Sequence, residues 1–128
     1  MVSIWKSCVV LALCAGVALA QRPQLQGTYR NLEPNGDPIS EKGTFRTHFT
    51  PIWGTPMLIG ITTFDDGTGP VLINDPAATY LVAPFGHDGY QWTTMGEEFA
   101  GLFHAEGDGF YMEYTHGEGG EDQYLERE

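Results

Sequence analysis

Four short segments of the chain place a small acidic or amide side chain directly before a glycine. These pairs are Asn35-Gly36, Asp66-Gly67, Asp88-Gly89 and Asp108-Gly109. Such pairs are typical of tight hairpin turns, because glycine and, less readily, Asn and Asp accept the positive φ angles that these turns need. Asp65 and Glu106 add further acids beside two of the turns, which turn geometry does not require. The chemistry that these carboxylates could perform is the capture of a hard cation.

Neighbouring carboxylates repel one another, and a divalent cation with oxygen ligands relieves that repulsion. In an up-and-down meander every second turn lies at the same end of the sheet, so the four turns are expected to share one end. The predicted cation-binding rim consists of Asp37, Asp65, Asp66, Asp88, Glu106 and Asp108. The expected ion is calcium, bound weakly, with a dissociation constant on the order of 10⁻⁴–10⁻³ M as in extracellular modules. The alternative interpretation is that these residues only form turns and keep the protein soluble.

Few residues are left for other kinds of site chemistry. Ser40 is the only serine and Lys42 the only lysine after residue 20, while Cys8 and Cys14 both lie before it. We therefore expect no thiol catalysis, no catalytic triad and no Schiff-base lysine. The four histidines lack the i, i+4 spacing of a helical zinc site. The sequence predicts a protein that is not an enzyme, with no catalytic residue, no histidine metal site and no cofactor beyond weakly bound calcium.

Residues 1–20 have the composition of a secretory signal peptide. Lys6 precedes an apolar run, and Ala18-Leu19-Ala20 matches the small-x-small pattern of a cleavage site. The apolar run is shorter than the roughly 20 residues that a membrane span needs. The sequence therefore predicts a secreted, extracellular chain that begins at Gln21, contains no cysteine and is not anchored in a membrane.

The predicted secreted chain is strongly acidic. Five basic and seventeen acidic residues remain after residue 20, which gives a net charge of −12. Most of the acids fall in residues 65–128, where Arg127 is the only basic residue. Such a field repels nucleic acids and anionic membranes and attracts cations and basic surfaces. The expected partners are calcium, a mineral or a basic extracellular surface, and neither nucleic acid nor a membrane.

Short alternating apolar segments between turn signals predict an all-β fold. Glycine and proline are frequent, and no segment after residue 20 keeps helical spacing over three turns. The eight predicted strands are residues 27–32, 43–50, 56–64, 70–74, 78–85, 89–95, 98–105 and 109–116. They predict one antiparallel meander over residues 21–116, closed into a barrel or folded into a compact sandwich. Residues 117–128 are predicted to form a frayed acidic tail with a short helical turn.

Aromatic residues are abundant and are expected to fill the centre of this fold. The alternative is that they surround a small-ligand cavity in an eight-stranded barrel, with Tyr90 and Trp92 in its wall. The segment LQGTYRNLEPNG, residues 25–36, resembles the first strand of calycin and avidin barrels, which begin with a Gly-Thr/Xaa-aromatic step. The resemblance is confined to these twelve residues, and the later strands lack the motifs of those families.

Together these features predict a secreted, acidic, non-enzymatic protein of an extracellular or biomineral-associated matrix that associates weakly with calcium. The alternative prediction is a small-ligand carrier built as a lipocalin-like or avidin-like barrel. A cavity lined by inward aromatic residues would favour the carrier over the matrix protein.

Overall fold

The computed structural model describes residues 22–128 except residues 73 and 75. The predicted signal peptide, its cleavage site and both cysteines lie outside the described residues. Among the residues that are described there is no helix, and thus none with the length and apolarity that a bilayer span requires.

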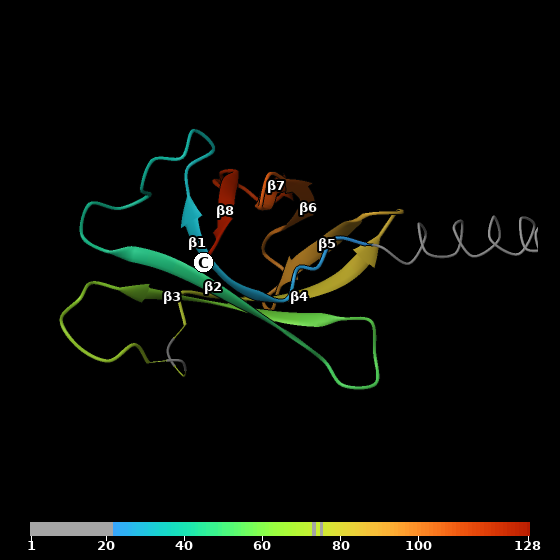
Figure 1. The fold of residues 1–128 in the computed structure, drawn as a ribbon, viewed down its shortest axis with the longest axis horizontal. Coiled ribbons are helices and arrows are strands. Elements are labelled where there is room, and N and C mark those ends of the chain that lie inside the picture. The colour runs from blue at the N-terminus through green and yellow to red at the C-terminus, as the bar shows by residue number, and fades with distance from the viewer. Residues whose placement is uncertain (1–21, 73, 75) are drawn as a thin grey trace, which may run out of the picture.

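Eight antiparallel strands close into a single barrel (Figure 1). Each strand pairs with its neighbours in sequence, and the last strand pairs with the first to complete the ring. The all-β meander is therefore confirmed, and it takes the form of a barrel and not of a sandwich. The strands are β1 (Gly27–Leu32), β2 (Thr44–Pro51), β3 (Leu58–Asp65), β4 (Ala78–Phe85), β5 (Gly89–Thr94), β6 (Ala100–Glu106), β7 (Gly109–His116) and β8 (Gln123–Arg127).

Two of the predicted elements are wrong, although the number of strands is right. Residues 70–72 belong to no strand and lie in the β3–β4 connection, where Pro70 has no backbone N–H to donate to a neighbouring strand. Conversely, the predicted acidic tail contains β8, which pairs with both β1 and β7. Leu125 in β8 is buried between two outward-facing neighbours, which is the alternation of a strand.

Large aromatic rings fill the interior of the barrel. Tyr29, Phe49, Trp92 and Phe103 are each less than 2 % exposed. The ring centroids of Phe49 and Phe103 lie 5.3 Å apart, and those of Tyr29 and Phe49 lie 5.6 Å apart, both in edge-to-face arrangements. An eight-stranded barrel is just wide enough for side chains to fill it. The central interior is therefore a packed aromatic core.

Two inward-facing glycines make room for these rings. A Cβ atom on Gly60 would lie 2.6 Å from Cε1 of Phe49. A Cβ atom on Gly101 would lie 2.7 Å from Cζ2 of Trp92 and 1.8 Å from the backbone oxygen of Glu113. These distances are too short for any side chain. Glycine is required at both strand positions because the neighbouring rings and backbone occupy that space.

The two ends of the barrel are formed by different connections. The β1–β2, β3–β4, β5–β6 and β7–β8 connections lie at one end, which we call the open mouth. The β2–β3, β4–β5 and β6–β7 connections lie at the other, which we call the plugged end. In Figure 1 the β1–β2 and β3–β4 loops extend to the left, and the β2–β3 and β4–β5 turns extend to the right.

The segment before β1, residues 22–26, closes the plugged end. Leu25 is 1 % exposed and belongs to the same cluster as the barrel's aromatic core. The hydroxyl of Tyr29 donates to the backbone oxygen of Leu25 at 2.8 Å, and that of Tyr90 donates to the backbone oxygen of Pro23 at 2.6 Å. The core rings therefore hold this segment in place from inside.

Two arginines hold the same segment from outside the core. The guanidinium of Arg127 lies 4.7 Å from the centroid of the Tyr29 ring and donates to the backbone oxygen of Gln26 at 3.0 Å. The guanidinium of Arg22 lies 5.5 Å from the Tyr90 ring and donates to backbone oxygens around the β4–β5 turn. Both contacts combine a hydrogen bond with a cation–π interaction.

Replacing Leu25 with alanine should destabilise the barrel, because the cavity left in the plugged end cannot collapse around a closed ring of strands. The expected loss in the free energy of unfolding is about 2–5 kcal/mol, measured by urea denaturation. Leu72→Ala is the matched control, since Leu72 is 62 % exposed and its loss should cost no more than about 0.5 kcal/mol. Equal, small effects at both positions would contradict the role of Leu25 as part of the core.

Burial raises the pKa of Tyr29 to about 12, against a smaller lowering by the Arg127 guanidinium. Because the folded pKa lies above the ordinary value of 10.0, the contribution of Tyr29 to stability is complete below pH 10. It should be lost as the pH rises through 12. Ultraviolet titration of the protein, compared with Tyr29→Phe, should show one phenol fewer near pH 12 in the variant. A missing phenol near pH 10 instead would show that Tyr29 is not buried.

Candidate functional site

The six carboxylates of the predicted cation rim do not lie together. Three of them, Asp37, Asp65 and Asp66, lie at the open mouth, and the other three, Asp88, Glu106 and Asp108, lie at the plugged end. The expectation that the four acid–glycine turns share one end is therefore wrong. The cause is the false strand over residues 70–74, because one extra strand reverses the end at which every later turn is placed.

Three members of the predicted rim also have partners within the protein; one is Asp37, whose Oδ2 accepts a hydrogen bond from Asn35 Nδ2 at 3.0 Å. Arg46 Nη1 lies 3.2 Å from Asp65 Oδ2. Hydrogen bonds from the hydroxyl and the backbone N–H of Thr68 lower the pKa of Asp66. Across residues 22–128, leaving aside 73 and 75, no three His, Cys, Asp or Glu side chains are arranged to hold a metal ion. Weak association with calcium stays a prediction.

The two residues predicted to line a ligand cavity are buried in the core. The hydroxyl of Tyr90 is hydrogen-bonded to the segment of residues 22–26 that closes the plugged end. Trp92 is 1 % exposed, and its ring centroid lies 5.3 Å from that of Tyr80 and 4.7 Å from that of Tyr114. Its Nε1 atom is buried without a hydrogen-bond partner in the described part of the chain. Trp92 therefore does not line a cavity itself but packs against Tyr80 and Tyr114, which line the hollow described next.

The open mouth contains a hollow of about 220 Å³, which we call the mouth hollow. Six of the eight strands contribute to its walls, namely β1, β2, β3, β4, β7 and β8. It is lined by Asn31, Ile39, Phe45, Thr62, Ala77, Ala78, Tyr80, Tyr114 and Gln123. The lining combines aromatic side chains with residues that carry hydroxyl and amide groups, and it contains no charged side chain among the described residues.

A chain of buried hydrogen bonds orders the polar side of this hollow. The hydroxyl of Thr47 donates to Asn31 Oδ1 at 2.8 Å, and Asn31 Nδ2 donates to Gln123 Oε1 at 2.9 Å. Thr47 Oγ1 and Thr62 Oγ1 lie 2.6 Å apart. Because a hydroxyl has one proton, Thr62 must be the donor in that pair. The chain joins β1, β2, β3 and β8 and fixes the orientation of each member.

Two phenols complete the wall. Burial raises the pKa of Tyr80 well above its ordinary value, with a smaller rise from the neighbouring Tyr114. Burial also raises the pKa of Tyr114. Both phenols are therefore neutral at physiological pH. They offer a hydroxyl and a ring face to a ligand, and no charge.

A second hollow adjoins the mouth hollow on its acidic side. We call it the acidic hollow; its volume is about 290 Å³, and it shares Ile39 and Gln123 with the mouth hollow. Its remaining lining is Glu33, Pro34, Glu121 and Asp122. An uncharged, partly aromatic hollow and a hollow bordered by carboxylates therefore adjoin at Ile39 and Gln123.

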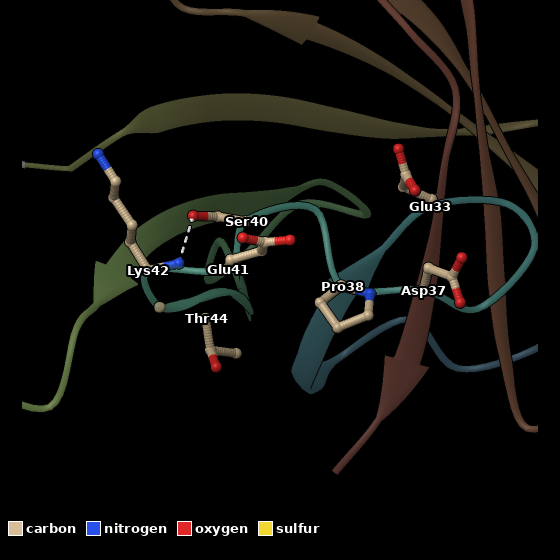
Figure 2. A pocket seen from close by; sticks show the side chains of 8 residues that line it. Glu33, Asp37, Pro38, Ser40, Glu41, Lys42 and Thr44 are labelled. Atoms are coloured by element: carbon tan, nitrogen blue, oxygen red, sulfur yellow. Dashed lines mark hydrogen bonds between the residues drawn. The ribbon is translucent and has the colours of Figure 1, made fainter.

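A third hollow of about 680 Å³, the lip hollow, lies along the β1–β2 loop and shares Glu33 with the acidic hollow. Figure 2 shows that Lys42 extends away from Glu33 and Asp37. The backbone N–H of Lys42 donates to Ser40 Oγ at 3.0 Å, which shapes the loop. The lysine at this lip therefore does not neutralise those two carboxylates.

Comparison of the chain with protein-family models, with curated proteins and with solved structures gives no match.

Sequence reasoning missed the residues that line the mouth hollow. Asn31 and Thr62 carried a usable signal, because each is polar at an inward position two residues after Tyr29 or Gly60. Gln123 carried no such signal, because its strand has a single buried residue and is defined by pairing with distant strands. The inward polar positions of β1 and β3 identify the mouth once the strands are correctly counted.

Replacing Thr47 with valine should remove the central hydroxyl of the buried chain while keeping the side-chain shape. Asn31 Oδ1 and the Thr62 proton would then each lack their partner, and the free energy of unfolding should fall by about 1–3 kcal/mol. Thr50→Val is the control on the same strand, since Thr50 is exposed and should change stability by no more than about 0.5 kcal/mol. Urea denaturation measures both. Equal stability of the two variants would contradict the hydrogen-bonded chain.

Proposed function

We propose that this barrel is a non-enzymatic protein that binds a small organic molecule in the mouth hollow. The observation that carries the proposal is the difference between the two ends. The chain's own residues 22–26 plug one end, while the other opens into a hollow with aromatic and polar walls. An eight-stranded barrel has room for one small ligand where side chains leave space.

The size and lining of the mouth hollow indicate the kind of ligand. A volume of about 220 Å³ is below the roughly 300–1,000 Å³ of sites for drug-sized molecules, so the enclosed part of the ligand has about the size of one ring. Phe45, Tyr80 and Tyr114 supply apolar contact area. The ordered amides and hydroxyls supply the few polar groups that set orientation.

The lining also supports binding and not catalysis. The described residues of the mouth hollow offer hydroxyls, amides and rings, but no carboxylate, imidazole or thiol. General acid–base and nucleophilic catalysis both depend on such groups within hydrogen-bond reach of the substrate. The exposed pair His104 and Glu113, 2.8 Å apart, lies on β6 and β7 outside this lining.

A second candidate is the predicted association with calcium or a basic surface in an extracellular matrix. It is supported by the crowding of carboxylates at the open mouth, which replaces the rim predicted from the turns. Low-millimolar calcium, the range in which extracellular modules bind it, should then raise the melting temperature. An unchanged melting temperature would remove this candidate.

Ligand binding can be followed through Trp92, which packs on two walls of the mouth hollow. The variant W5F/W53F leaves Trp92 as the single tryptophan; Trp53 itself is 96 % exposed. Benzylamine, benzyl alcohol and benzoate serve as probes, because they share one ring and differ in charge. We expect at least one of them to shift Trp92 emission in a saturable manner.

A variant that fills the hollow tests the location of the bound probe. Ala78 lines the mouth hollow, so Ala78→Leu in the same background should abolish the emission change. Ala105→Leu, at an exposed position outside this lining, should keep it. Melting curves establish that both variants are folded. No response to any probe, or an equal response in both variants, would contradict the proposal.

A further inference from the structure

We infer that the ligand of the mouth hollow is a small organic cation, with its ring or apolar body in the mouth hollow and its ammonium group in the acidic hollow. This inference rests on the proposed function and names the class of ligand. The site consists of the two adjoining hollows, and the carboxylates determine the charge that it accepts.

The two ends of the barrel differ strongly in charge. Ten carboxylates lie at the open mouth among the described residues: Glu33, Asp37, Glu41, Asp65, Asp66, Glu97, Glu98, Glu118, Glu121 and Asp122. Lys42 lies in the same loops, and Arg46 on β2 pairs with Asp65. The plugged end carries Asp88, Glu106 and Asp108 beside Arg22 and Arg127, and Glu128, which follows β8, pairs with Arg46. The negative field therefore concentrates where the cavity opens, which raises the local concentration of cations.

One carboxylate of the acidic hollow, that of Asp122, is held in position by two hydrogen bonds. Asp122 Oδ1 accepts a hydrogen bond from the backbone N–H of Tyr114 at 2.8 Å, and Asp122 Oδ2 accepts one from the hydroxyl of Tyr111 at 2.8 Å. Tyr114 itself forms a wall of the mouth hollow. A negative charge is therefore anchored beside an aromatic wall, and Glu33 and Glu121 add exposed charge around it.

The aromatic walls favour the same class of ligand. Phe45, Tyr80 and Tyr114 line the mouth hollow, and aromatic rings both bury an apolar body and stabilise a cation that lies over a ring face. No arginine or lysine is found among the described residues that line either hollow. A carboxylate ligand would have no positive partner there and would face the surrounding carboxylates.

An inorganic dication fits these hollows less well than an organic cation. Calcium takes six to eight converging oxygen ligands, and in the described part of the chain no three acidic or histidine side chains converge. An ammonium group on a ring needs fewer ligands, because diffuse negative charge and aromatic faces both stabilise it. The geometry therefore selects a single charge carried on an apolar body.

The three probes that share one ring test the sign of the charge. At low salt we expect benzylamine to bind about tenfold more tightly than benzyl alcohol, the effect of a few partly screened charge contacts, and benzoate to bind most weakly. At about 1 M sodium chloride, where screening acts within roughly 3 Å, the preference for benzylamine over benzyl alcohol should shrink to a few-fold. Trp92 emission in the W5F/W53F background measures all three dissociation constants.

Charge-neutralising variants at the two ends of the barrel test where the ammonium group lies. Glu33→Gln/Glu121→Gln should weaken benzylamine several-fold and leave benzyl alcohol unchanged. Asp88→Asn/Asp108→Asn removes the same charge at the plugged end and should leave both probes unchanged. All four positions are exposed, so the variants should fold normally, as melting curves will show.

The possible failures are distinguishable. If benzyl alcohol or benzoate binds as tightly as benzylamine, the barrel still binds a small molecule, and the inference about its charge is overturned. If both double variants weaken benzylamine equally, the placement in the acidic hollow is overturned. If no probe binds, the proposed function falls together with this inference.

Discussion

Strand β8 lies between β7 and β1, and this position turns an open sheet into a closed barrel. Tyr29 and Arg127 are direct partners in the β1–β8 register, and the guanidinium of Arg127 also covers the Tyr29 ring. One contact thus joins the first strand, the last strand and the plug. Without β8 the sheet would have two free edges, and the rings behind Leu25 would face water.

The interior changes in character along the barrel axis. Near the plug, the inward residues are Leu25 and aromatic rings that bond to backbone oxygens. Toward the mouth, the inward positions become Asn31, Thr47 and Thr62, which satisfy one another. Residues two apart in a strand face the same side, so the change is visible within a single strand. In β1, the inward residue changes from Tyr29 to Asn31. The inward positions thus form a tight aromatic core at one end and a hydrogen-bonded polar cluster at the other.

Much of the barrel could be predicted from local pattern, and its ends could not. Strands 27–32, 78–85 and 109–116 were predicted with the bounds that they have, because aromatic and β-branched residues alternate there between turn signals. The apolar run at 70–74 gave the same local signal, but it begins at Pro70, is followed by Pro76 and has no partner strand in its described part. Strand β8 gave almost none, since only long-range pairing defines it. The false strand and the missed β8 cancelled in the number of strands, which stayed at eight. The false strand nevertheless placed the later acidic turns at the wrong end of the barrel, so the predicted cation-binding rim was wrong.

The concentration of carboxylates around one end gives the molecule an electric dipole along its barrel axis. Near a cationic surface such a molecule turns its negative end toward the surface, so adhesion also sets its orientation. The pole that would touch the surface is also the end that contains the mouth hollow. Adhesion to a basic matrix and uptake of a soluble ligand would therefore compete for the same end of the protein, and release from the surface would free that end.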